Sequence, residues 1–124
     1  MKRILVVCLA LLVPLIPTVG GCGGREEAGA VPADYQAGES KFNANCARCH
    51  GERGRGTNQG PPLVHKIYEP NHHGDPAFQM AAANGVRAHH WQFGNMPKID
   101  GVTPAEVTEI TKYVRWLQRQ AGIE

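Results

Sequence analysis

The residues with the clearest chemical potential are two cysteines and a histidine that lie close together, Cys46, Cys49 and His50. Their spacing, C-x-x-C-H, is the attachment sequence for a c-type haem. The two thiols add to the two vinyl groups at one edge of the porphyrin, and the histidine directs its imidazole at the iron. The motif therefore predicts one haem c, covalently bound through both cysteines, with His50 as a metal ligand.

Two other kinds of site also use paired cysteines. A thioredoxin-like redox pair is accompanied by a βαβ pattern, and no such pattern is visible near this motif. A structural zinc site needs a second pair of ligands at suitable spacing, and the other histidines offer no convincing one. The haem interpretation is favoured because the neighbouring segments agree with it independently.

The segment before the motif has a helical pattern, over residues 34–45. Tyr35, Gly38 and Phe42 form a stripe that leads into the first cysteine, and we expect Asp34 to be the N-cap. A glycine inside a helix costs about 1 kcal/mol relative to alanine. We therefore expect another helix to approach closely at Gly38.

The clearest helix of the chain is predicted near its C-terminus. Thr103, Pro104 and Glu106 combine a capping box with a proline at the first helical position, and Gly122 is the expected stop. An apolar stripe follows the cap, formed by Val107, Ile110, Val114 and Leu117, with Tyr113 at its edge. A shorter helix is predicted over residues 76–84, with Asp75 as its N-cap.

The composition suits one small domain that is rich in loops. The chain has 124 residues, among them 15 glycines and 9 prolines, and only 6% of its residues are aromatic. No alternating run is long enough for a real sheet. These features predict an all-α fold, with three or more helices and long loops wrapped around the haem. A net charge of +2 is too even for a protein that binds nucleic acid.

The chain from about residue 34 to residue 121 resembles a class I cytochrome c, the small monohaem electron-carrier fold. The resemblance rests first on a glycine, an aromatic residue and the first haem cysteine at spacings of four: Gly38, Phe42 and Cys46. It implies the cytochrome c fold, in which the C-terminal helix crosses the glycine near an aromatic position that Tyr113 fills. It also implies an electron carrier, not an enzyme, with redox proteins as partners.

The resemblance extends to the surroundings of the iron. Gly60, Pro61, Pro62 and Leu63 resemble the family's Gly-Pro-x-Leu, in which the proline carbonyl accepts a hydrogen bond from Nδ1 of the haem-binding histidine. The Met-Pro pair that begins at Met96 resembles the one that carries the sixth ligand. The resemblance therefore implies a His/Met pair, which raises the reduction potential of a cytochrome c.

Other residues keep different interpretations open. Met80 lies in a short apolar helix, and we expect it in the core or in the wall of the haem pocket. Two histidine pairs, His72–His73 and His89–His90, are expected on the surface or at the rim of the pocket, and they leave bis-His ligation open. An open sixth position would suit a small haem enzyme subunit, or a gas or redox sensor. Trp91 either donates a hydrogen bond to a haem propionate or packs against the ring.

The N-terminal segment has the features of an export signal. Lys2 and Arg3 precede an apolar run from Ile4 to Ile16. This run is too short for an ordinary membrane span, which needs roughly 20 apolar residues. Small residues then lead to Cys22, in a pattern that resembles the lipobox of bacterial lipoproteins. We therefore expect lipid attachment at Cys22 and a location at the periplasmic or cell-surface face of a bacterial membrane.

The predicted organisation has three parts: a signal peptide over residues 1–21, a flexible linker over 22–33 and a cytochrome c domain over 34–124. Removal of the signal peptide takes away two of the 13 basic residues, which leaves 11 basic and 11 acidic residues. The mature protein is then formally neutral. We expect it to recognise its redox partners by contact more than by long-range charge.

Overall fold

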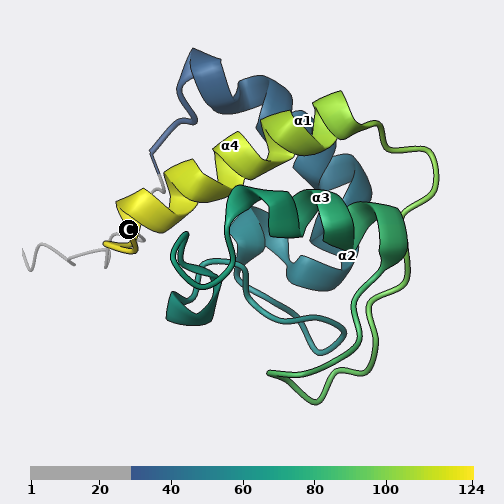
Figure 1. Ribbon diagram of the computed structural model, residues 1–124. Coiled ribbons are helices and arrows are strands. Elements are labelled where there is room, and N and C mark those ends of the chain that lie inside the picture. Colours follow the sequence, from purple (N-terminus) through teal and green to yellow (C-terminus); the bar gives the residue numbers. More distant parts are fainter. Residues whose placement is uncertain (1–28) are drawn as a thin grey trace, which may run out of the picture.

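The computed structural model describes residues 29–124 (Figure 1). The predicted signal peptide, the predicted lipidation site Cys22 and most of the predicted linker lie outside these residues. The helices of the described part are α1 (Ala33–Asn45), α2 (Ala47–His50), η1 (Glu52–Gly54), η2 (Lys66–Tyr68), α3 (Asp75–Asn84) and α4 (Pro104–Gln120). Residues 29–124 contain no β-strand, only one isolated bridge. The prediction of an all-α fold is confirmed.

The core lies where α1 and α4 cross (Figure 1). Gly38 of α1 is buried at this crossing, and a side chain there would collide with the backbone of α4 at Glu109. The close approach expected at Gly38 is therefore confirmed. The buried core cluster contains Phe42, Leu63, Ile110, Tyr113, Val114, Trp116 and Leu117. Tyr113 is fully buried within this cluster.

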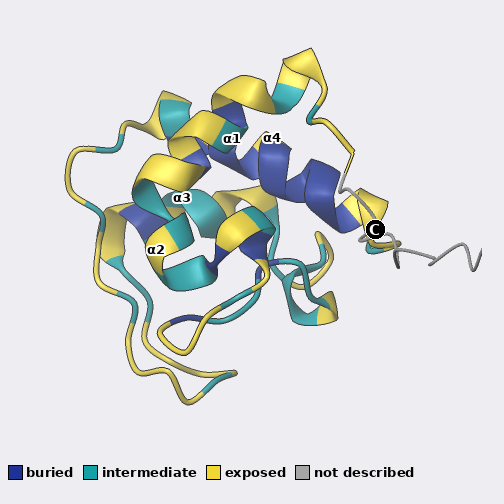
Figure 2. Ribbon diagram, turned by 180° about the vertical axis from the view of Figure 1, so that it is seen from behind, coloured by how far each residue is buried: buried dark blue, intermediate teal, exposed yellow. Residues whose placement is uncertain are grey.

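Burial is concentrated in α4, whereas the long loops are mostly exposed or half-buried (Figure 2). Outside the helices, Val31 packs against the core, so packed structure begins within the last residues of the predicted linker. No helix between residues 29 and 124 is both long enough and apolar enough to cross a bilayer.

The start of α4 has the predicted capping box. Thr103 Oγ1 accepts a hydrogen bond from the Glu106 backbone N–H, and the Thr103 N–H donates to Glu106 Oε2 at 2.9 Å. Glu106 also pairs with Lys41 of α1. The ion pair joins the start of the last helix to the first helix. These hydrogen bonds favour the charged carboxylate and lower the pKa of Glu106 from 4.5 to about 2. The bond from Lys41 makes the largest contribution, and the bonds from Thr103 come next.

The predicted N-caps of the other two helices were wrong. Helix α1 is preceded by Pro32, which makes no side-chain cap, and Asp34 lies in the first turn instead. Helix α3 is preceded by Gly74, and Asp75 is its first residue. A carboxylate in a first turn still interacts favourably with the helix dipole, which accounts for the acidic residues at both starts.

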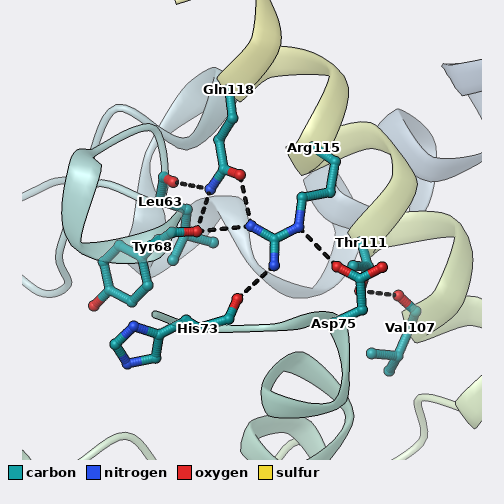
Figure 3. Close-up of polar contacts among 8 residues, drawn as sticks. All are labelled: Leu63, Tyr68, His73, Asp75, Val107, Thr111, Arg115 and Gln118. Atoms are coloured by element: carbon teal, nitrogen blue, oxygen red, sulfur yellow. Dashed lines mark hydrogen bonds and ion pairs between the residues drawn. The ribbon is translucent and has the colours of Figure 1, made fainter. Parts of the chain in front are cut away.

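A buried arginine joins the loop before α3 to α4 (Figure 3). Arg115 is only 7% exposed, and its guanidinium donates to the carbonyl oxygens of Tyr68 and His73 and to the Asp75 carboxylate. Gln118 Nε2 donates to Leu63 O at 2.8 Å and to Tyr68 O at 3.0 Å. These bonds satisfy backbone carbonyls that would otherwise be buried without partners. They fix the path of residues 63–75 beside α4.

Candidate functional site

The cysteine motif follows directly from α1 and forms the short helix α2. The Cys46 N–H donates to Phe42 O at 2.8 Å, and the His50 N–H donates to Cys46 O at 2.9 Å. Both cysteines are half-buried free thiols. The pKa of Cys46 rises to about 11, mainly because the thiol is buried and to a smaller extent because the Cys49 thiol lies nearby. The helical turn thus presents two thiols and one imidazole from a single short segment.

The imidazole of His50 is oriented by a backbone carbonyl. His50 Nδ1 lies 2.9 Å from Pro61 O, and since a carbonyl oxygen only accepts, Nδ1 carries the proton. Thr57 Oγ1 donates to Cys49 O at 2.6 Å, which holds the loop before Pro61 against the motif. Burial lowers the pKa of His50, and the Pro61 hydrogen bond opposes this shift. The hydrogen bond thus occupies Nδ1 and leaves Nε2 available to bind a metal.

Met96 is held in place by the end of α3. Its backbone forms an antiparallel bridge with Val86, with both N–H···O distances at 2.9 Å. Gly85, with φ of +75°, allows this pairing because a Cβ there would lie 2.5 Å from Met96 O. The Ile99 N–H also donates to Ala82 O at 2.9 Å. The loop that carries Met96 is thus paired at Met96 with Val86, just beyond the end of α3, and is bonded to α3 itself three residues later, at Ile99.

A cavity of about 490 Å³ brings most of the predicted site residues together. Cys46, His50, Pro61 and Met96 all line it, whereas Cys49 is not among its lining residues. The apolar part of the wall includes Ala77, Phe78, Ala81, Ala82, Val107 and Ile110. The volume lies within the roughly 300–1,000 Å³ of typical ligand pockets. Met80 also lines the cavity and is 64% exposed, so it is a wall residue and not part of the core.

Trp91 adds a polar group to this apolar cavity. Its side-chain Nε1 is buried and makes no well-formed hydrogen bond, although it lies close enough to the Tyr68 hydroxyl to oppose the rise in the pKa of that group. The Trp91 ring packs edge-on against His65, at 5.0 Å between centroids. A buried N–H without a partner is costly, and an acceptor on a bound group would remove that cost. With paired thiols, an imidazole oriented by Pro61, apolar walls and this N–H, the described residues fit a haem.

The structure brings together the two histidine pairs, a contact that sequence reasoning missed. His72 Nε2 lies 3.1 Å from His90 Nε2, and the ring centroids of His73 and His89 are 5.8 Å apart. His73, His89 and His90 line the cavity, and all four histidines except the half-buried His73 are exposed. The pKa of His90 is lowered, first by partial desolvation of its ring and then by charge repulsion from the three neighbouring histidines. The doubled histidines were the one available signal, but nothing in the spacing indicated that the pairs meet.

Comparison with known proteins agrees with this site. The family model described as cytochrome c matches residues 35–118, which include the cysteine motif, Pro61 and Met96. Searches of curated proteins and of solved structures returned no match. The matched segment covers more than half of the chain and runs from α1 into α4. The chain therefore belongs to the cytochrome c family, whose domains carry covalently bound haem c and typically transfer electrons to and from redox proteins.

Proposed function

We propose that this protein is a class I monohaem cytochrome c in which His50 and Met96 are the two axial ligands, and that it works as a membrane-tethered electron carrier. Haem supplies one-electron chemistry at its iron when it is bound. The observation that carries the proposal is the shared cavity, because His50 and Met96 come from distant parts of the chain and both line it. Two protein ligands would leave no iron position for a substrate.

His50 has the properties that a permanent ligand requires. The Pro61 carbonyl holds the proton on Nδ1 and restrains rotation of the ring. Such a hydrogen bond also raises the basicity of the ligating nitrogen. Cys46, one helical turn before His50, and Cys49, the residue next to it, are the thiols we assign to the covalent links.

Met96 has a backbone position that suits a fixed thioether ligand. The bridge to Val86 restrains the main chain at Met96 itself, and the Ile99 hydrogen bond restrains it three residues later. A thioether ligand raises the potential of a c-type haem. Met80 also lines the cavity, but it lies within α3. We therefore assign the ligand to Met96.

The walls of the cavity would control water and charge around the iron. Apolar side chains from α3 and α4 exclude water, which lowers the local dielectric constant. The unpartnered Trp91 Nε1 is a suitable donor to a haem propionate. This hydrogen bond would keep the indole in place and favour the ionised carboxylate.

The cellular location belongs to the same proposal. A signal peptide over residues 1–21 would export the chain, and a lipid at Cys22 would hold it through the linker at the outer face of a bacterial membrane. The cytochrome c domain would then exchange electrons with redox proteins close to that membrane. Mass spectrometry of the exported protein tests this part, because it reports the haem, the processed terminus and any acyl chains together.

Absorption spectroscopy of the purified exported protein tests the ligand assignment. We expect the ferric protein to show the weak far-red band of sulfur-to-iron charge transfer, and the ferrous protein to bind carbon monoxide poorly. Rapid carbon monoxide binding would instead indicate an open position, as in a small haem enzyme or a gas sensor. A colourless protein without added prosthetic mass would contradict the proposal as a whole.

A pair of methionine variants identifies the sulfur. Met96→Ala should abolish the far-red band and lower the reduction potential. Met80→Ala, on the wall of the same cavity, is the matched control and should keep both. The reverse result would assign the ligand to Met80. Retention of the band in both variants would exclude both residues.

A further inference from the structure

Four histidines from two loops meet at the edge of the haem cavity. His72 and His73 lie in the loop before α3, and His89 and His90 lie in the loop that follows it. One ring nitrogen from each of His72, His73 and His90 lies within 4.8 Å of the corresponding nitrogens of the other two. The proposed electron carrier uses none of these side chains.

The separations are close to those of a metal site. A zinc ion binds histidine nitrogens at about 2.0–2.1 Å, which places two nitrogens of a tetrahedral site roughly 3.4 Å apart. His72 Nε2 and His90 Nε2 are already 3.1 Å apart. The nitrogen of His73 lies within 4.8 Å of both, so a small movement of exposed rings completes the set.

Two of the four rings have the hydrogen bond that metal-binding histidines usually make. His73 Nδ1 donates to Ile67 O at 2.7 Å, and His89 Nδ1 donates to Arg87 O at 2.8 Å. Each bond places the proton on Nδ1 and leaves the Nε2 lone pair free. The backbone of His73 is fixed as well, because its carbonyl accepts from the buried Arg115. Part of the site is therefore oriented before any ion binds.

The cluster is also accessible. His72 and His90 are exposed and His73 is half-buried, so an ion reaches the nitrogens from solvent without passing through the haem cavity. Imidazole ligands without carboxylates or thiolates suit zinc, copper and nickel, and do not suit magnesium or calcium. Among these ions, Cu²⁺ binds most tightly at a given site of nitrogen ligands.

We propose that His72, His73 and His90 form a second metal site that binds one divalent transition-metal ion, Cu²⁺ more tightly than Zn²⁺. The site lies at the rim of the haem cavity. His89 is adjacent to it and is available as a fourth ligand. This inference requires only that none of these histidines is the sixth ligand of the haem iron.

Metal titration of the untagged holoprotein tests the proposal. We expect one equivalent of Cu²⁺ to bind, with nitrogen couplings from several imidazoles in the electron paramagnetic resonance spectrum. Mutations outside the first ligand shell already cost about 10–100-fold in metal affinity. The double variant H72A/H90A, which loses two ligands, should therefore bind Cu²⁺ and Zn²⁺ about 100-fold more weakly or not at all.

His65→Asn is the matched control. His65 is a histidine outside the cluster that caps η2 by accepting a hydrogen bond from the Ile67 N–H at 3.2 Å. Asparagine retains a cap acceptor, so this variant should fold and bind Cu²⁺ as the wild type does. The proposal is overturned if the wild type binds no equivalent of Cu²⁺, or if H72A/H90A and the control bind equally.

The haem spectrum separates this site from iron ligation. The double variant should keep the absorption spectrum and reduction potential of the wild type in the absence of added metal. A changed spectrum would show that one of the mutated histidines binds the haem iron, and the second metal site would then be rejected. Copper binding tests the second metal site, and the far-red band of the haem tests the His/Met assignment. Failure of one proposal can therefore be distinguished from failure of the other.

Discussion

Gly38 of α1 lies directly against the backbone of Glu109 in α4. A Cβ built on Gly38 would stand 2.1 Å from the carbonyl oxygen of Glu109 and 2.8 Å from Cβ of Tyr113. The first atom belongs to the backbone of α4 and the second is bonded directly to it. A change of side-chain rotamer moves neither atom, so it cannot relieve the collision. Only a glycine permits the two helices to cross at this separation.

The crossing leads to a prediction for Gly38→Ala. Because the helices must move apart, the holoprotein should lose about 1–3 kcal/mol of unfolding free energy, or more. Gly29→Ala is the control, since a Cβ at Gly29 meets no atom within 4 Å, and it should change stability by less than about 0.5 kcal/mol. Denaturant unfolding of both variants measures the difference. Equal stability of the two would show that the crossing is looser than described.

The Arg115 network leads to a second prediction. Arg115→Met removes the donor to two backbone carbonyls and to the Asp75 carboxylate, and it should destabilise the holoprotein by about 3–5 kcal/mol. Asp75→Asn should cost at most about 1 kcal/mol, because the Asp75 side chain is 68% exposed. Urea unfolding distinguishes them. Similar losses in the two variants would mean that the ion pair matters more than the carbonyl contacts.

Trp91 provides a third prediction, which concerns the haem environment. Trp91→Phe keeps an aromatic ring and removes the buried Nε1 donor. If that N–H stabilises an ionised haem propionate, its loss raises the propionate pKa. The pH-dependent region of the reduction potential should therefore move to higher pH in the variant. Superimposable potential–pH curves of variant and wild type would instead assign Trp91 to packing alone.

Glu106 provides a fourth prediction, on acid stability. Its pKa is lowered from 4.5 to about 2 in the folded protein, chiefly by Lys41, so it stabilises the fold above pH 4.5. That contribution is lost as the pH falls from 4.5 to about 2. Glu106→Gln keeps a cap acceptor and removes the charge, so its melting temperature should fall less over this range.

Lys41→Met tests the cause of that shift. It removes the largest influence on the Glu106 pKa and leaves the capping box intact. The acid-dependent loss of melting temperature should then be smaller than in the wild type and be complete at a higher pH, because it still begins near pH 4.5 but the folded-state pKa is less depressed. If both variants follow the wild-type curve from pH 5 to pH 2, Glu106 does not contribute to acid stability.

Patterns within short stretches of sequence were sufficient for much of the fold. The capping box at Thr103 depends on residues three apart, and the C-x-x-C-H motif on residues within one helical turn. The helices α1 and α4 follow from apolar periodicity, and Gly38 marked their crossing because a glycine inside a helix needs a packing reason. The N-caps at Asp34 and Asp75 were wrong because an acidic residue suits a first turn as well as a cap.

Contacts between distant loops required the tertiary structure. No periodicity relates His72 to His90 or Arg115 to His73, since these residues meet through the irregular loops around α3. The bridge between Val86 and Met96 likewise depends on the turn at Gly85. Residue type and local spacing thus determined the helices and the haem-binding motif. The paths of the loops, which backbone hydrogen bonds and buried side chains fix only in the folded chain, decided which other residues reach the cavity.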